Sequence, residues 1–105
     1  MAAKGWAYLQ SKMSREMRET LKRKPFLSKM FAGLVVHDET ATLLQAKYGD
    51  RFNYQRSSEI DFIDNLDTQE IELATTTGEA RHWAYQRYWH PTVQYATYDL
   101  PPGIP

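Results

Sequence analysis

The chain has 105 residues, which is enough for one domain, with 42% hydrophobic and 25% charged residues and a formal net charge of zero. It contains no cysteine, which excludes disulfide scaffolds, thiolate zinc sites and cysteine nucleophiles. The longest apolar run, residues 32–36, is too short for a membrane-spanning helix or the core of a signal peptide. We therefore expect a globular protein without a membrane-spanning segment.

Charge is distributed unevenly along the chain. Residues 1–60 carry eleven basic and six acidic side chains, a net charge of +5, whereas residues 61–105 carry two basic and seven acidic ones, a net charge of −5. One interpretation is that the basic half holds a phosphate backbone while the acidic half binds metal or performs acid–base chemistry. The other is that a neutral domain simply has uneven solvated faces.

Helical patterns fill the first half. Residues 5–24 predict one helix, which Pro25 ends, because their apolar side chains recur at spacings of three or four. These side chains are Trp6, Leu9, Met13, Met17 and Leu21. A second short helix is predicted over 26–34 and a third over 39–48, with Asp38 as N-cap and Gly49 as the C-terminal stop.

The hydrophobic period then changes to two, which predicts strands. The predicted strands cover 51–56, 59–64, 70–76 and 92–100. A turn at 65–68 joins the second strand to the third, and a helix with Thr77 as N-cap is predicted over 78–89. We therefore expect an α+β fold in a single domain, 1–105. A helical N-terminal part, 1–38, precedes an αβββαβ core, 39–100, with a mixed four-stranded sheet.

The most informative pair of residues is Asp61 and Glu72. They lie on the two predicted strands of a hairpin, where matched side chains on one face approach to within ~5 Å. Two carboxylates at that distance repel each other unless they share a cation or a proton. A Mg²⁺ ion accepts one or two carboxylates and completes its shell with water and phosphate oxygens, so Asp61 and Glu72 are candidate magnesium ligands.

This part of the sequence resembles the PD-(D/E)xK, or restriction-endonuclease-like, nucleases. The stretches 59–64 (EIDFID) and 69–74 (QEIELA) match that family in order, with Asp61 and Glu72 at its acidic positions. The proline that precedes the Asp in the family is not present, and Ala74 stands where the family has its catalytic Lys. Three explanations are open: an engineered inactive form, a Lys supplied from elsewhere, with Lys47 as candidate, or a resemblance in topology alone.

The C-terminal portion also resembles the toxic tips of bacterial polymorphic and contact-dependent growth inhibition toxins. The resembling stretches are 57–62, 71–73, 75–78 and 95–98, together with His82. The resemblance implies a nuclease that cleaves RNA, often tRNA, in the cytoplasm of a bacterium after delivery from a neighbouring cell. It also implies a specific immunity protein as partner, and in some such toxins a metal-free mechanism built on His, Thr, Arg and Tyr.

A second group of candidate residues surrounds the start of the predicted helix 78–89. Its members are Thr75, Thr76, Thr77, Gly78, Arg81, His82 and Tyr85. The hydroxyls and Arg81 could hold a phosphate, and His82 could act as general acid or base, because an imidazole changes charge near neutral pH. In RNA the neighbouring 2′-OH can be the nucleophile, so no metal is needed. The structural alternative is a helix cap followed by a polar helical face.

The remaining candidates have simpler structural explanations. Arg15 and Arg18 on the basic N-terminal helix could follow a phosphate backbone, or could merely form a solvated face. His37 and His90 lack metal-ligand spacing and are interpreted as surface or loop residues. A competing class of function is a non-catalytic adaptor or inhibitor that holds a protein partner through its basic helix and aromatic residues.

Overall fold

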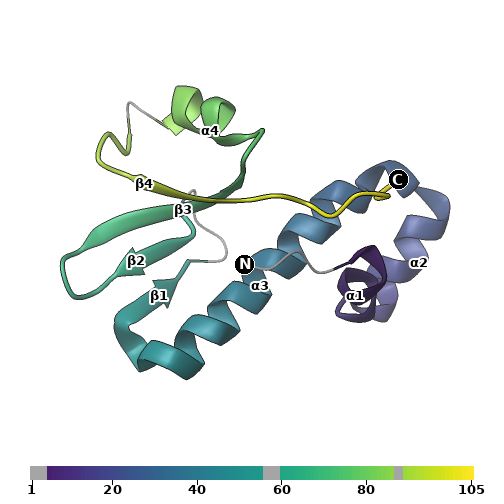
Figure 1. Ribbon diagram of the computed structural model, residues 1–105, viewed down its shortest axis with the longest axis horizontal. Helices are drawn as coiled ribbons and strands as arrows, with labels where there is room; N and C mark the ends of the chain where they lie inside the picture. The colour runs from purple at the N-terminus through teal and green to yellow at the C-terminus, as the bar shows by residue number, and fades with distance from the viewer. Residues whose placement is uncertain (1–4, 56–59, 87–88) are drawn as a thin grey trace. The chain divides into compact units, whose positions relative to one another are not determined.

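The computed structural model describes residues 5–55, 60–86 and 89–105, without the side chain of Tyr85. The chain divides into two compact units, of which the first comprises Met1–Glu39 with Leu100–Pro105 and the second comprises Thr40–Asp99. Figure 1 shows the elements of each unit along the chain. Over the described residues, no helix combines the length and apolar character that a membrane span requires.

The first unit is helical. Its elements are α1 (Trp6–Ser11), α2 (Arg15–Arg23), a 3₁₀ turn (Pro25–Leu27) and the first part of α3. The predicted single helix over 5–24 is wrong, because the chain leaves the helix after Ser11 and a new helix begins beyond Ser14. The Ser14 hydroxyl accepts a hydrogen bond from the backbone N–H of Met17 at 3.1 Å, which is the contact of an N-cap.

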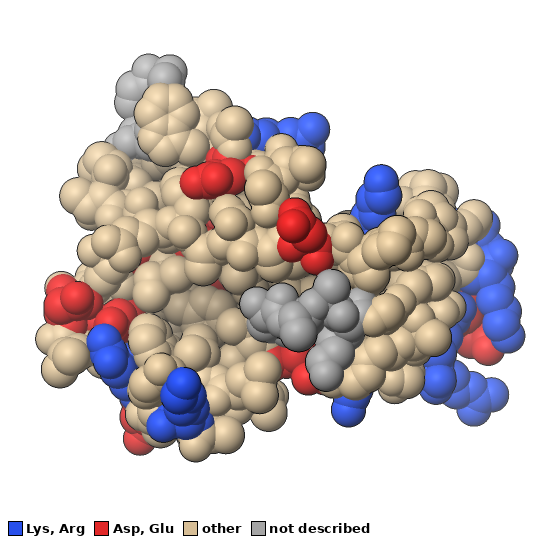
Figure 2. All heavy atoms as spheres, in the orientation of Figure 1, with Lys and Arg blue, Asp and Glu red and all other residues tan. Residues whose placement is uncertain are grey.

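Apolar side chains from α1, from the turn between α1 and α2 and from α3 form the interior of this unit. The buried ones are Leu9, Met13, Ala32, Val35 and Val36. In contrast, α2 buries none of its residues. Its basic side chains gather on the surface, as Figure 2 shows for Lys and Arg.

Helix α3 (Ser28–Tyr48) is one continuous helix of 21 residues. The prediction of two helices, over 26–34 and 39–48, is therefore wrong, and Asp38 is not an N-cap. The ring nitrogen Nδ1 of His37 lies 2.6 Å from the carbonyl oxygen of Gly33, so this His is held inside the helix and not in a loop. The predicted stop at Gly49 is confirmed: its φ of +62° ends the helix, at a position that favours glycine.

The second unit contains the sheet. After a 3₁₀ turn (Gly49–Arg51) follow β1 (Phe52–Tyr54), β2 (Phe62–Asp64), β3 (Gln69–Thr75), α4 (Glu79–Gln86) and β4 (Gln94–Tyr98). The spatial order is β1-β2-β3-β4 (Figure 1). β1 and β2 pair antiparallel, as do β2 and β3, whereas β3 and β4 pair parallel. The predicted α+β class, with N-terminal helices and a mixed four-stranded sheet, is confirmed, although every strand but the third is clearly shorter than predicted.

Alternation along the strands separates two faces of the sheet. On one face the rings of Tyr54 and Phe62 stack with centroids 5.1 Å apart. On the other face the Glu72 side chain contacts His82 and Gln86 of α4. The two faces therefore carry different chemistry: an aromatic one, and one with polar groups buried beneath a helix.

Candidate active site

The structure brings Asp61 and Glu72 together. Asp61 directly precedes β2, and extending the β2–β3 register by one pair beyond Phe62 and Ile71 sets Asp61 opposite Glu72. The Asp61 carboxylate oxygen Oδ2 also accepts a hydrogen bond from the backbone N–H of Leu73 at 2.7 Å. This bond fixes Asp61 against β3, beside the Glu72 side chain.

Glu72 is buried, and only one of its two carboxyl oxygens makes hydrogen bonds within the described structure. Its side chain is 5% exposed. The oxygen Oε2 accepts from the Gln86 amide nitrogen at 2.8 Å and lies 2.9 Å from Nδ1 of His82. The other oxygen, Oε1, is buried and has no hydrogen-bond partner among the described residues. A buried carboxylate oxygen in this situation calls for a proton or a cation.

The surroundings of Glu72 hold a proton on its carboxyl group. Burial, followed by the hydrogen bond with Asp61 and its charge, raises the pKa of Glu72 to about 8, against a smaller lowering by Gln86. The protonated form of Glu72 is therefore favoured at neutral pH. A proton on Oε1 would turn this partnerless acceptor into a donor beside the Asp61 carboxylate, and the pair would share it.

His82 is attached to this pair through its ring. It comes from α4, and its side chain is 41% exposed. When the Glu72 proton lies on Oε1, Oε2 accepts a hydrogen bond from Nδ1 of His82. A neutral His82 then has its lone pair on Nε2, which is the form that a general base requires.

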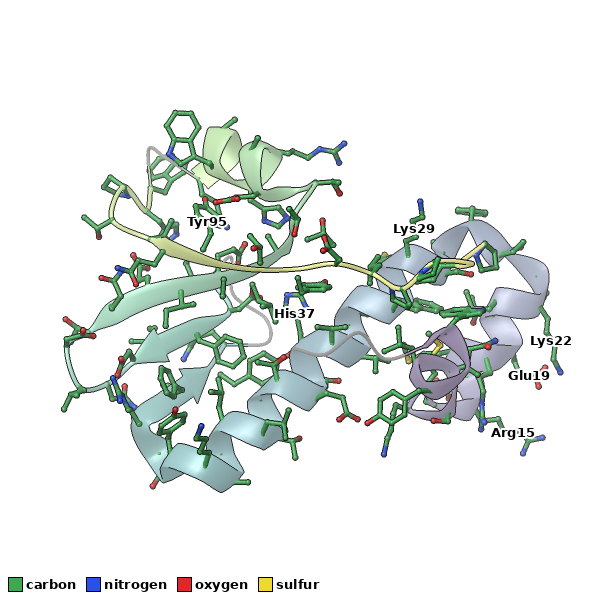
Figure 3. All side chains as sticks on the ribbon, in the orientation of Figure 1. Arg15, Glu19, Lys22, Lys29, His37 and Tyr95 are labelled. Carbon is green, nitrogen blue, oxygen red and sulfur yellow. The ribbon has the colours of Figure 1, made fainter. Side chains whose placement is uncertain are left out.

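Gln86 and Tyr95 complete the cluster, and their types and spacing in the sequence do not by themselves assign them to it. The Gln86 amide oxygen accepts from the Tyr95 hydroxyl at 3.1 Å, while its nitrogen donates to Glu72. Tyr95 lies on β4 as the register partner of Glu72, and Figure 3 labels it. The spacing from His82 to Gln86 places both on one helical face, which is the signal in the sequence that could have identified Gln86.

Ala74 contributes no charge to the site. It is buried two residues beyond Glu72 on β3, so both side chains lie on the same face. None of the main causes of the Glu72 pKa shift is a Lys or Arg. Lys47, the alternative source of a catalytic ammonium group, is exposed at the end of α3, with Nζ 5.3 Å from the ring centroid of Tyr48.

The hydroxyl groups of Thr75 and Thr76 contact backbone groups of neighbouring residues. The Thr75 hydroxyl accepts from the backbone N–H of Gly78 at 3.0 Å, and the Thr76 hydroxyl lies 3.4 Å from the Tyr98 carbonyl oxygen. The predicted N-cap at Thr77 is wrong, because the carbonyl of Gly78 accepts the first helical bond, from His82. A Cβ atom on Gly78 would lie 2.7 Å from the Thr75 hydroxyl oxygen, which explains the glycine.

The remaining predicted contacts lie elsewhere or cannot be placed. Thr77 and Arg81 are exposed in the second unit, while Arg15 and Arg18 are exposed on α2 in the first unit. In Figure 3 Arg15 points away from α2. The Tyr85 side chain lies outside the described structure.

Burial affects two more ionisable groups, both on β4. Burial and then the charge of Asp61 raise the pKa of Tyr98 to about 12, and burial followed by the charge of Glu72 raises the pKa of Tyr95. His90 lies after α4 with Nδ1 2.7 Å from Oε2 of Glu70, which faces it from β3. The acidic residues of β3 thus each have a histidine partner.

The cluster has acceptors suited to a hard cation. Glu72 Oε1 is buried without a donor beside the Asp61 carboxylate, and carboxylate oxygens are what Mg²⁺ prefers. Within residues 5–55, 60–86 and 89–105 no group of three or more metal-binding side chains occurs, so such an ion would depend on two carboxylates. Comparison of the chain with protein-family models, with curated protein sequences and with solved structures finds no match.

Proposed function

We propose that the second unit is a nuclease centre of the bacterial toxin type, which cleaves phosphodiester bonds in RNA, tRNA foremost. The observation that carries the proposal is the convergence of Asp61 and Glu72 on adjacent strands, with the pKa of Glu72 raised to about 8. Such strongly shifted carboxyl pairs occur preferentially at functional sites. The αβββαβ order with Asp61 and Glu72 at the acidic positions supports a centre of the PD-(D/E)xK kind, from which Ala74 departs.

Ala74 explains the protonated state of the pair. In that kind of centre a Lys would stand at position 74, on the same face as Glu72. Its ammonium group would favour the ionised forms of both carboxyls. Without it, one proton replaces the missing positive charge, and we propose that the chain as it stands is an inactive or weakly active form.

Asp61 and Glu72 would hold the Mg²⁺ ion in this mechanism. Bound there, the ion would polarise the phosphoryl group and lower the pKa of a water molecule. The chain's own contribution is to position the two carboxylates, through the Leu73 N–H on Asp61 and through Gln86 on Glu72. Hydrolysis adds the water oxygen to phosphorus and returns a proton to the leaving oxygen.

The decisive experiment restores the positively charged side chain at position 74. Ala74→Lys should introduce Mg²⁺-dependent cleavage of tRNA, measured by gel electrophoresis with and without EDTA. Ala74→Met is the matched control, because it fills similar space without charge and should remain inactive. Combining Ala74→Lys with Asp61→Asn should abolish the new activity. A folded Ala74→Lys protein that cleaves neither RNA nor DNA would contradict the proposal.

The contact between His82 and Glu72 supports a second route to the same reaction. His82 Nε2 can take the proton of a 2′-OH, whose oxygen then attacks phosphorus while the bond from phosphorus to the 5′-oxygen breaks and that oxygen takes a proton from water. Arg81 and Thr77, both exposed nearby along the chain, are the groups proposed to hold the phosphate. Cleavage of RNA that resists EDTA and is lost in His82→Ala would assign the activity to this route. DNA, which has no 2′-OH, should then be resistant.

The biological setting follows from the same proposal. A toxin of this type would act in the bacterial cytoplasm after delivery from a neighbouring cell, and a specific immunity protein would bind it. Inducing Ala74→Lys inside bacteria should stop growth, whereas Ala74→Met should not. Growth unaffected by the activated form, despite its full expression, would contradict the toxin assignment.

A non-catalytic adaptor is the competing function. Its support is the exposure of Trp83 and Trp89, at 53% and 77%, since exposed tryptophans are frequent anchors of protein interfaces. If neither Ala74→Lys nor the unaltered chain cleaves nucleic acid, and Trp83→Ala abolishes binding of a partner, the adaptor is the better assignment.

A further inference from the structure

A cavity of about 640 Å³ lies in the second unit, between the C-terminal part of α3 and the strands β1 and β2. Its volume falls within the range of about 300–1,000 Å³ that is typical of small-molecule sites. Phe62 lines it, and Phe62 is opposite Ile71 in the sheet, one position away from the pair formed by Asp61 and Glu72. Since neighbouring positions point to opposite faces, the cavity lies on the other face from the catalytic cluster.

The lining combines aromatic rings with side-chain amides. The side chains that define its chemistry are those of Gln45, Asp50, Phe52, Tyr54 and Asn65. Each amide offers a donor and an acceptor, and an aromatic wall favours a flat ligand. Asp50 is the one charged residue among the described lining residues, so the cavity provides no cation for a phosphate group.

We infer that this cavity binds an unpaired nucleobase, with guanine preferred. A carboxylate can accept two parallel hydrogen bonds, and guanine presents N1–H and N2–H side by side, which Asp50 can accept together. Uracil lacks adjacent donors. The amides supply partners for the remaining ring atoms, and the Asn65 amide is already held in place by donating to the Asp50 carbonyl oxygen at 2.8 Å.

The inference rests on the proposed function for its choice of an RNA base as ligand. It adds a recognition site remote from the scissile phosphate, which would select the RNA that is cleaved. The aromatic side of the cavity is well defined, because the rings of Tyr54 and Phe62 are nearly parallel, with 22° between their planes. Stacking of a base on such rings tolerates any base, so the preference for guanine depends on Asp50.

The test is a titration of the full chain with guanosine, followed by calorimetry or by NMR chemical shifts. Guanosine should bind with a Kd between about 10 µM and 1 mM, the range expected for a ligand of its size. Uridine should bind at least about 5-fold more weakly. The Asp50→Asn variant should lose about 10-fold or more in guanosine affinity, which is the usual consequence of removing a charge-assisted pair.

Controls separate this inference from the nuclease proposal. Asp67→Asn, an exposed residue of the β2–β3 turn, and Glu72→Gln in the catalytic cluster should both bind guanosine like the unaltered chain. Gln45→Ala gives a second variant of the cavity in case Asp50→Asn fails to fold. Equal affinity for uridine, binding of methyl glucoside in place of guanosine, or no binding at ~5 mM would overturn the inference. Cleavage by Ala74→Lys does not depend on guanosine binding, so either proposal can fail while the other holds.

Discussion

Tyr95 and Glu72 are register partners on β4 and β3, and the Gln86 side chain hydrogen-bonds to both of them. The Tyr95 hydroxyl orients the Gln86 amide so that its nitrogen, and not its oxygen, faces the Glu72 carboxyl group. The polar cluster beneath α4 is therefore continuous from β4 through α4 to β3. In a small domain, such a buried network ties the helix to the sheet at one specific angle.

The first prediction concerns this network. Tyr95→Phe removes the donor to the buried Gln86 oxygen and should lower the free energy of unfolding by about 1–2 kcal/mol. Chemical denaturation followed by circular dichroism measures the change. Tyr48→Phe is the control, because Tyr48 is 43% exposed and contacts Phe52 through its ring, which Phe retains. Equal stabilities of the two variants would mean that the Tyr95 hydroxyl bond is not formed in solution.

Glu72 should make the protein less stable as the pH rises. Its folded pKa of about 8 lies above the ordinary 4.5, so between these values the folded state binds the additional proton. Stability is then lost with rising pH by up to about 1.4 kcal/mol per unit, until Glu72 ionises in the folded state as well. Denaturation midpoints measured over this range should show the decline.

Glu72→Gln should flatten that decline, because the amide resembles the protonated carboxyl group and cannot ionise. It should be more stable than the unaltered chain above pH 8. Glu79→Gln, an exposed residue in the first turn of α4, is the matched control and should keep the original pH profile. A profile that Glu72→Gln leaves unchanged would place the shared proton elsewhere.

Arg51 and Asp64 predict the opposite dependence in acid. Two hydrogen bonds, at 3.0 and 2.9 Å, join the guanidinium group to the carboxylate. The Arg51 hydrogen bond is the main cause that lowers the pKa of Asp64. The contribution of this pair is thus present above the ordinary pKa of an Asp and is lost as the pH falls through the lowered folded value.

Arg51→Met should therefore lower the Tm near neutral pH, and the difference from the unaltered chain should shrink in acid. Thermal unfolding monitored at several pH values from neutral to strongly acidic tests this. Arg18→Met, on the solvent side of α2, changes the same residue type without touching Asp64 and should have little effect. A difference in Tm that stays constant down to acid would assign the loss to packing of Arg51 on Phe52 instead.

The sequence predicted the sheet better than the helices, for identifiable reasons. Alternation around Phe62 and between Glu70 and Thr75 is a local pattern, so it can be read directly from the sequence. Because a short turn joins these two strands, their register also places Asp61 opposite Glu72. The continuity of α3 is different, because Gly33 and Asp38 are weak helix formers that the surrounding helix overrides.

The extent of the polar cluster was harder to predict than its centre. Asp61 and Glu72 follow from strand register, whereas the bonds of Gln86 depend on how α4 packs on the sheet. That packing is set by contacts distant in sequence, which periodicity does not encode. His82 was identified from its chemistry, and the structure adds the orientation of its ring toward Glu72.

Ser14 provides a last prediction, on the break between α1 and α2. The apolar spacing of residues 5–24 is that of one helix, yet the Ser14 hydroxyl caps a new helix by accepting from the Met17 N–H. Ser14→Ala should lower the free energy of unfolding by about 1 kcal/mol, the usual effect of losing such a cap. Ser11→Ala is the control and should change stability by less than about 0.5 kcal/mol, because Ser11 is exposed and caps no helix start. An uninterrupted helix in solution would reverse the prediction for Ser14→Ala: alanine inside such a helix would stabilise it, and helical circular dichroism would increase.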